Sequence, residues 1–198
     1  MGFLKEKCTF NVLSPSLLSS AFEFDCGHPD LNDFFQNDCI KYSDQLIGKS
    51  YCFTLDEDER TIVCAFTVSN DSIKTNTLPN NRKKNVTKLI PRVKHFKSYP
   101  AVLIGRLGVN VKFKRMGMGD ELMDFIKSWF IDPNNKTGCR FIVVDSYNEQ
   151  VPLNYYYKNG FKTLFANEEQ EKEYTQQDSV LKTRLMYFDL IVLSGKPF

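Results

Sequence analysis

The stretch that decides the fold is Ala101–Phe130, AVLIGRLGVNVKFKRMGMGDELMDFIKSWF. Its first part, Ala101–Val111, is apolar and rich in β-branched residues, which predicts a strand. Its last part predicts a helix from about Met118 to Ile131, because apolar residues recur there at intervals of three and four and form one apolar face. We expect the helix to end at Asp132, because the residue before a proline is pushed out of the helical region.

The turn between them, Lys114–Gly119 (KRMGMG), has the features of an anion site. Gly117 and Gly119 let a ligand approach the backbone, and the first N–H groups of a helix have no partner within the helix. The helix dipole adds positive potential, and Lys114 and Arg115 add full charge. The spacing is neither the dinucleotide fingerprint GxGxxG nor the P-loop GxxxxGK[ST]. Two glycines that only relieve crowding between a strand and a helix remain the alternative.

The composition is that of a globular protein of 198 residues, with 42% hydrophobic and 25% charged residues. We expect a single domain over residues 1–198, without a membrane span or signal segment, because no apolar run approaches about 18 residues. Six cysteines are scattered without a CxxC pair, and there are only two histidines. This pattern disfavours a zinc site and indicates reduced thiols in a cytoplasmic protein without a metal.

The remaining chain predicts alternating strands and helices, with a basic segment at 74–99 and an exposed acidic insertion at 167–182. The strands are expected at Thr9–Leu13, Ser50–Leu55, Thr61–Asn70, Arg140–Tyr147 and Thr183–Leu193. The helices are expected at Leu17–Ala21, from Asp30 to about Leu46, and at Asn148–Asn159, the last one stopped by Gly160.

The basic segment is densest between Arg82 and Lys97, where seven cations occur without one acid: Arg82, Lys83, Lys84, Lys88, Arg92, Lys94 and Lys97. A run of like charge is usually a solvated loop. It can also be a surface that faces phosphates. Both readings stay open from the residues alone.

The turn resembles the acetyl-CoA signature of the GNAT N-acetyltransferases, [Gln/Arg]-x-x-Gly-x-[Gly/Ala] after the fourth strand. Lys114, Gly117 and Gly119 occupy the three positions, with lysine where glutamine or arginine is usual. The resemblance implies that acetyl-CoA is the cosubstrate and that backbone N–H groups hold its pyrophosphate. These groups would come from Arg115, Met116, Gly117, Met118, Gly119 and Asp120, while the strand at Leu107, Gly108 and Val109 would pair with the pantetheine arm.

Further matches extend the resemblance over most of the chain. Tyr156–Phe161 (YYKNGF) is similar to the Tyr-x-x-x-Gly-Phe segment of GNAT proteins. FDCGHPDLNDFF and LIGRLGVN, with Arg106, resemble segments of the GNAT toxins of type II toxin–antitoxin pairs. The family implies an α/β (α+β) fold, the GNAT acyl-CoA N-acyltransferase fold, with a mixed, mostly antiparallel sheet flanked by helices. The toxin branch implies aminoacyl-tRNA as the acceptor and a ribbon-helix-helix antitoxin as partner.

Acetyl transfer needs a proton for the leaving thiolate, and a phenol within hydrogen-bond reach can supply it. The resemblance assigns this catalytic role to Tyr156. The base stays open between Asp145, Glu149 and water, since an α-amino group has a pKa near 7.7 and needs little help.

On the acceptor side, Lys83, Lys84 and Lys88 would contact tRNA phosphates. Arg106 would orient a phosphate of the acceptor, unless it forms an internal salt bridge.

Two other readings are consistent with the same residues. The first is an N-acetyltransferase that acts on a small amine or a protein N-terminus. The second is a GNAT-fold module that binds acyl-CoA or RNA without turnover. The sequence also leaves a homodimer as one option for the assembly.

Overall fold

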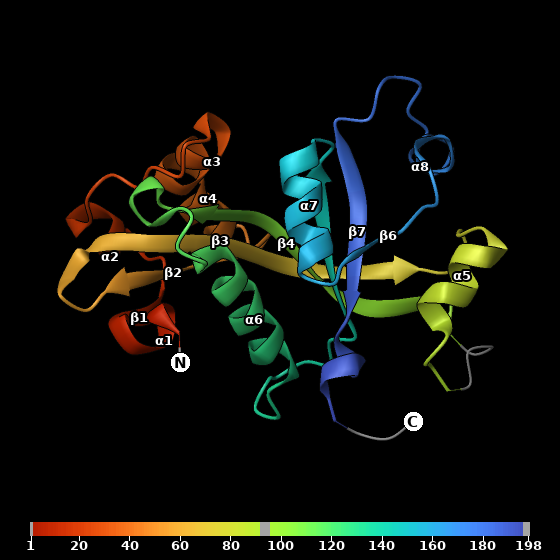
Figure 1. The fold of residues 1–198 in the computed structure, drawn as a ribbon, viewed down its shortest axis with the longest axis horizontal. Coiled ribbons are helices and arrows are strands. Elements are labelled where there is room, and N and C mark those ends of the chain that lie inside the picture. The colour runs from red at the N-terminus through yellow and green to blue at the C-terminus, as the bar shows by residue number, and fades with distance from the viewer. Residues whose placement is uncertain (1, 92–95, 196–198) are drawn as a thin grey trace. The chain divides into compact units, whose positions relative to one another are not determined.

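The computed structural model describes residues 2–91 and 96–195. Figure 1 shows the helices and strands in chain order. They are α1 (Phe3–Lys7), β1 (Cys8–Val12), α2 (Pro15–Ser20), α3 (Pro29–Asp33), the π-helical η1 (Phe34–Asp38), α4 (Cys39–Asp44), β2 (Lys49–Leu55), β3 (Asp58–Lys74), α5 (Asn80–Thr87), β4 (Ser98–Val109), the 3₁₀ turn η3 (Val111–Phe113), α6 (Met118–Ile131), β5 (Phe141–Tyr147), α7 (Gln150–Lys158), β6 (Lys162–Thr163), α8 (Glu168–Thr175), β7 (Thr183–Asp189) and the 3₁₀ turn η4 (Leu190–Leu193).

The strands form a seven-stranded sheet in the order β1-β2-β3-β4-β5-β7-β6. Pairing is antiparallel between β1 and β2, β2 and β3, β5 and β7, and β6 and β7. The predicted α+β fold, with a mixed and mostly antiparallel sheet and flanking helices, is confirmed.

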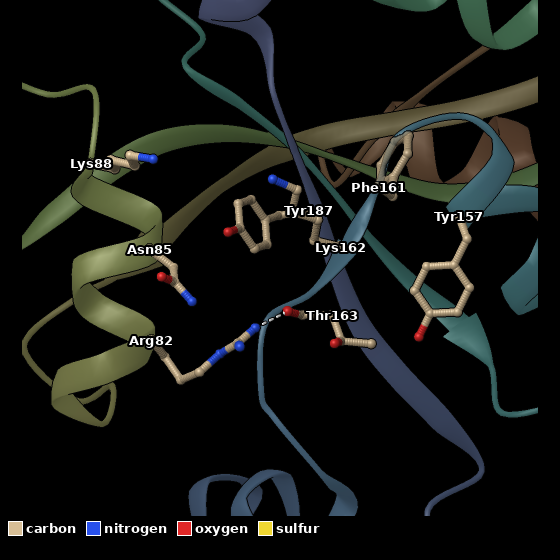
Figure 2. A pocket seen from close by; sticks show the side chains of 8 residues that line it. All are labelled: Arg82, Asn85, Lys88, Tyr157, Phe161, Lys162, Thr163 and Tyr187. Atoms are coloured by element: carbon tan, nitrogen blue, oxygen red, sulfur yellow. Dashed lines mark hydrogen bonds between the residues drawn. The ribbon is translucent and has the colours of Figure 1, made fainter.

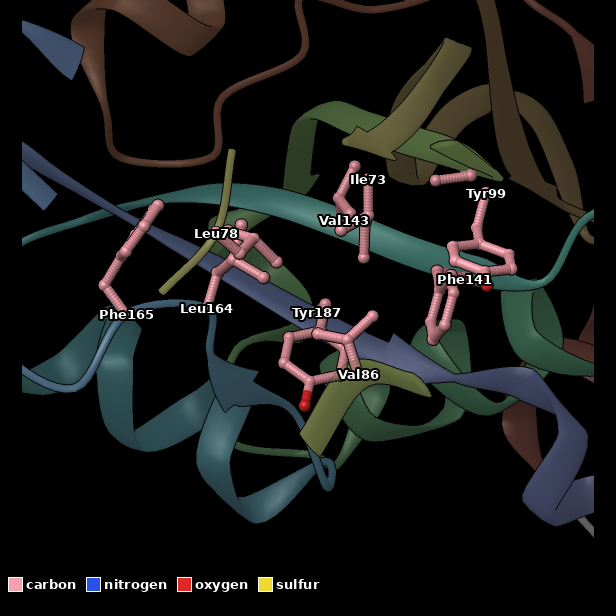
Figure 3. Packing of buried hydrophobic residues seen from close by; sticks show 10 residues of the cluster. Ile73, Leu78, Val86, Tyr99, Phe141, Val143, Leu164, Phe165 and Tyr187 are labelled. Carbon is pink, nitrogen blue, oxygen red and sulfur yellow. The ribbon is translucent and has the colours of Figure 1, made fainter. Parts of the chain in front are cut away.

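The chain divides into two compact units. The first unit is Met1–Ser69 with Ile104–Ile126, and the second unit is Asn70–Leu103 with Lys127–Phe198. Each has its own apolar core. That of the first unit includes Leu13, Phe24, Cys26, Phe34, Phe35, Cys39, Cys52, Ile62 and Ala65. The core of the second unit, drawn in Figure 3, comprises Ile73, Leu78, Val86, Tyr99, Ala101, Phe141, Val143, Leu164, Phe165 and Tyr187.

The first helical stretch of the first unit differs in detail from the expected helix. It begins at Pro29 instead of using Asp30 as its cap, and His28 is the N-cap residue. Proline is favoured at the first helical position because its fixed φ already suits a helix and its missing N–H would have no partner there. Residues 34–38 then widen into a π-helical turn that buries Phe34 and Phe35.

In the second unit, α7 ends as expected before Gly160, whose φ is +80°. A Cβ at this position would lie 3.1 Å from the ring of Phe188, so packing also favours glycine. Phe161, which follows, is 2% exposed and packs against Phe188 with ring centroids 5.6 Å apart. The last strand, by contrast, stops at Asp189 instead of reaching Leu193, because residues 190–193 form η4.

The acidic segment 167–182 is not wholly exposed. It forms α8, and Glu171 on this helix is only 2% exposed. Its carboxylate accepts hydrogen bonds from Arg184 Nε at 2.7 Å and from the Leu185 backbone N–H at 2.5 Å. The charge is therefore paired where the helix meets β7.

The basic segment also contains a helix, α5, that the sequence did not predict. Its residues NNRKKNVT carry a single aliphatic side chain, Val86, so no apolar period was visible. Val86 is buried in the core of the second unit and attaches the helix there. Among the described residues, no helix combines the length and the apolar character needed to cross a membrane.

The buried ion pair of α8 leads to a stability prediction. Glu171→Ala leaves Arg184, whose side chain is only 11% exposed, without its carboxylate, so the free energy of unfolding should fall by about 3 kcal/mol. Glu173→Ala, at an exposed position of the same helix, is the matched control and should change it by about 0.5 kcal/mol at most. Urea unfolding followed by circular dichroism measures both. Equal stabilities of the two variants would contradict the assigned role of Glu171.

Candidate functional site

Asn110 connects β4 to the glycine-bearing turn in the first unit. Its side chain is buried, and Nδ2 donates a hydrogen bond to the carbonyl oxygen of Ile62 at 3.0 Å. Its backbone N–H donates to the carbonyl of Val63 at 2.9 Å, and its Oδ1 accepts from the Lys112 N–H at 3.0 Å. One side chain thus attaches the start of η3 to β3 and sets the path of the backbone into the turn.

The turn has an open and partly left-handed backbone. Arg115 has a φ of +64° and Gly117 a φ of +81°, a region that favours glycine. A Cβ at Gly117 would meet no atom within 4 Å, so the backbone there faces open space. The carbonyl of Gly117 accepts from the N–H groups of Asp120 and Glu121, each at 3.1 Å, which starts the first turn of α6. The anion site that the sequence indicated at this turn stays a prediction, which the open backbone at Gly117 supports.

The two cations of the turn have different surroundings. Lys114 and Arg115 are both exposed. Lys114 Nζ would lie 2.9 Å from a Cβ added at Gly27, next to Asp25. Hydrogen bonds from Asn32 and from the Gly27 N–H lower the pKa of the Asp25 carboxyl, and the Lys114 charge contributes less. Lys114 is therefore directed in part toward a carboxylate, which makes Arg115 the stronger candidate for a bound anion.

The two glycines of β4 lie in opposite environments. A Cβ at Gly108 would lie 3.0 Å from Cys26 Cβ, so packing already explains this glycine. A Cβ at Gly105 would meet nothing within 4 Å. Leu107 and Val109 are half-buried on either side of Gly108. Gly105, which the sequence did not single out as a binding residue, thus offers the more open backbone of this strand.

Arg106 is exposed, and its Nη1 donates to the Gly105 carbonyl at 2.7 Å. Its guanidinium carbon lies 4.9 Å from the centre of the Phe34 ring, within the range of a cation–π contact. With the residues that the structure describes, Arg106 forms no ion pair. The internal salt bridge considered from the sequence is therefore not observed among them, and a stacked, exposed guanidinium remains.

Tyr156 lies on α7 in the second unit. Its ring packs edge-on against Tyr155 and Phe161, with centroids 5.1 and 5.3 Å apart. Burial raises the pKa of the Tyr156 hydroxyl to about 12. The phenol therefore keeps its proton over the whole physiological range, as a proton donor must.

The two candidate carboxylate bases, Asp145 on β5 and Glu149 at the N-cap of α7, are both exposed. Exposure gives neither of them an environment that distinguishes it as a base. Nor does any group of three or more His, Cys, Asp or Glu residues within the described ranges have a geometry that could hold a metal ion.

The cations of the basic segment are not equivalent. Lys84 is exposed on α5, Lys88 is exposed at the C-cap of this helix, and Lys83 is half-buried. Arg82 instead donates from Nε to the Leu164 carbonyl at 2.6 Å, which fastens its guanidinium to the chain after β6. Two further cations of the segment, Arg92 and Lys94, lie outside the described residues. The surface predicted to face phosphates thus includes one helix with exposed lysines and one fixed arginine.

No protein-family model matches the sequence, and no curated protein matches it. Solved structures match almost the whole chain. KacT, in a structure described as a tyrosine-to-phenylalanine mutant, has a TM-score of 0.69 and 17% identity, and the match covers 95% of this chain and 98% of KacT. AtaT complexed with acetyl-methionyl-tRNAfMet has a TM-score of 0.69 and 19% identity, covering 94% and 96%. AtaTR bound with AcCoA has a TM-score of 0.68 and 20% identity, covering 95% and 96%.

The chain has the GNAT fold. KacT and AtaT are GNAT-fold toxins of type II toxin–antitoxin systems. The resemblance to this branch that the sequence indicated is confirmed at the level of the fold.

The glycines of β4 provide a paired test of packing against open space. Gly108→Ala should lower the free energy of unfolding by about 1–3 kcal/mol, because the new methyl group overpacks against Cys26. Gly105→Ala meets open space and should change it by about 0.5 kcal/mol or less. Both are measured by urea unfolding. If Gly108→Ala were as stable as the wild type, close packing against Cys26 would not be the reason for glycine at this position.

Proposed function

We propose that the protein is an acetyl-CoA-dependent N-acetyltransferase whose acceptor is the amino group of an aminoacyl-tRNA. The observation that carries the proposal is the open, left-handed turn at Gly117, at the N-terminus of a 14-residue helix. This turn occurs in a chain with the fold of AtaT, which has been solved with acetyl-CoA and with acetyl-methionyl-tRNAfMet.

The end of β4 and the turn before α6 supply the groups that would bind acetyl-CoA. The pyrophosphate would be held by backbone N–H groups of the turn, with Arg115 providing the main side-chain charge. The N–H of Asp120, which the resemblance also assigned to this role, already donates to the Gly117 carbonyl at 3.1 Å. Lys114 adds a second cation, part of whose charge is directed toward Asp25. The backbone of Leu107–Val109 would pair with the pantetheine arm, with Gly105 leaving room beside it. Hydrogen bonds to a charged group of this kind are each worth about 1.5–3 kcal/mol.

Tyr156 on α7 is the proposed proton donor. The neutral amine attacks the thioester carbonyl, a C–N bond forms, the C–S bond breaks, and the sulfur takes the proton of the Tyr156 hydroxyl. The nitrogen releases its surplus proton to water, which suffices for an α-amino group with a pKa near 7.7. The Tyr156 phenolate then takes a proton back from water, so one proton is released for each one consumed. KacT and AtaT have each been solved as a tyrosine-to-phenylalanine mutant, which supports the choice of a tyrosine as the proposed proton donor.

The acceptor and the partner complete the proposal. Lys83, Lys84 and Lys88 would contact tRNA phosphates, and Arg106 would orient one phosphate of the acceptor. AtaT has been solved with the C-terminus of its antitoxin AtaR, and KacTA has been solved with DNA. We therefore propose a ribbon-helix-helix antitoxin as the partner of this chain, and the cytoplasm, where charged tRNA is found, as its location.

The proton donor is tested by Tyr156→Phe. The ring and its packing are kept while the hydroxyl is lost, so kcat should fall by about 10²–10⁴-fold. Acetyl-CoA affinity, measured by calorimetry, should be unchanged. Tyr174→Phe, a half-buried tyrosine of the same unit whose ring packs on Phe165, is the control and should keep the wild-type rate. A wild-type rate for Tyr156→Phe, measured as release of free coenzyme A thiol, would remove this tyrosine from the mechanism.

The acceptor is tested by the salt dependence of charged-tRNA binding. Replacing Lys83, Lys84 and Lys88 with alanine should make the slope of log affinity against log salt shallower by about two, from roughly 0.7 per single-stranded phosphate contact. Alanine at Lys5, Lys7 and Lys49, three exposed lysines of the first unit, should leave the slope unchanged. A slope that is flat for the wild type, with rapid acetylation of a polyamine or peptide, would instead indicate a small-amine or peptide acceptor.

A further inference from the structure

A pocket of about 460 Å³ lies within the second unit, bounded by α5, the C-terminal end of α7, β6 and β7 (Figure 2). It is lined by Arg82, Asn85, Lys88, Tyr157, Phe161, Lys162, Thr163 and Tyr187. None of these eight described residues carries a carboxylate, whereas three carry a positive charge. The lining therefore favours an anion.

Arg82 is the fixed charge of this pocket. Its Nε donates to the Leu164 carbonyl at 2.6 Å and its Nη2 donates to the Thr163 carbonyl. Within the described residues, Nη1 donates no hydrogen bond to protein. Two backbone acceptors thus hold the guanidinium in one orientation and leave one nitrogen for a ligand. A pre-oriented guanidinium loses less rotamer entropy when it binds an oxyanion.

Three further polar groups complete the lining. Lys88 at the C-cap of α5 and Lys162 on β6 are exposed lysines, one from each side of the pocket. Between them stands Tyr187 of β7, which is only 5% exposed and whose hydroxyl points toward α5 in Figure 2. Burial, opposed by the nearby Arg82 charge, raises the pKa of Tyr187, so its hydroxyl stays protonated and can donate to an oxyanion.

The size of the pocket and its rim indicate more than a bare phosphate. Pockets for small ligands usually measure about 300–1,000 Å³, so this one has room for a nucleoside attached to the phosphate. Tyr157, which exposes 47% of its surface, offers an aromatic face at the rim. Unstacked bases bind such faces without strong sequence preference.

We propose that this pocket is a nucleotide-binding site, in which Arg82, Lys88, Lys162 and the Tyr187 hydroxyl hold the phosphate and Tyr157 stacks on the base. The nucleotide is either a free mononucleotide or one residue of an RNA chain. The RNA source rests on the proposed function, because the acceptor would then place one nucleotide here. The mononucleotide source does not depend on it.

Calorimetry with AMP, with adenosine, and with a short single-stranded RNA tests the site on the full chain. Lys162→Gln and Lys88→Gln should each weaken binding of the phosphorylated probe by about tenfold, the effect of one charge-assisted hydrogen bond. Tyr187→Phe keeps the buried ring and should weaken it severalfold. Lys182→Gln, at an exposed position that does not line the pocket, is the matched control. Adenosine, which lacks the phosphate, should bind at least tenfold more weakly than AMP.

The outcomes separate this site from the proposed acetyl transfer. Binding of AMP would identify a free mononucleotide as the ligand. Binding of the RNA but not of AMP, lost in Lys162→Gln, would identify an RNA strand as the ligand. Either result stands even if charged tRNA is never acetylated. Equal affinities of Lys162→Gln and wild type for both probes would overturn the proposal. So would displacement of the bound nucleotide by acetyl-CoA, because the nucleotide would then occupy the cosubstrate's own site.

Discussion

The buried side chain of Asn110 is the constraint on which the first unit's candidate site depends. A strand that ends in a sheet and continues into a glycine-bearing turn leaves backbone groups that need partners. Asn110 satisfies three of them at once, through the carbonyls of Ile62 and Val63 and the N–H of Lys112. Because β3 is held by its own pairing with β2, the turn inherits a rigid support. The left-handed residues that follow can then keep their backbone open toward a ligand.

In the second unit, charged side chains likewise support the local structure by binding fixed partners. Arg184 is paired with the buried carboxylate of Glu171, and Arg82 is fastened to two backbone carbonyls. Neither arginine behaves as a solvated surface charge. The two arginines differ in the net charge that remains. The carboxylate of Glu171 neutralises Arg184, whereas the backbone carbonyls that hold Arg82 are neutral and leave its positive charge uncompensated. A fixed and uncompensated guanidinium beside two lysines is what makes the neighbouring pocket electropositive.

Burial also divides the chemistry among the aromatic residues. Tyr156 and Tyr187 both lie where loss of water favours the neutral phenol, which raises their pKa values. A phenol that stays protonated can donate either a proton to a leaving group or a hydrogen bond to an oxyanion. Tyr157, one position along α7 from Tyr156, exposes 47% of its surface and would offer its ring in the nucleotide site that we propose. The helical spacing thus gives adjacent tyrosines different exposure to solvent.

Local pattern was sufficient for the elements whose signals lie within a few residues. The helix Met118–Ile131 followed from apolar spacing and from the proline after it, and the turn at Gly117 followed from glycine and charge spacing. Packing partners far apart in the chain decided the rest. Arg82 meets carbonyls 81 and 82 residues away, so a run of cations could not reveal that one of them was anchored. The sequence does not distinguish Gly105 from Gly108, because both lie in one apolar strand. The structure distinguishes them, because the side chain of Cys26 packs against Gly108 while Gly105 faces open space.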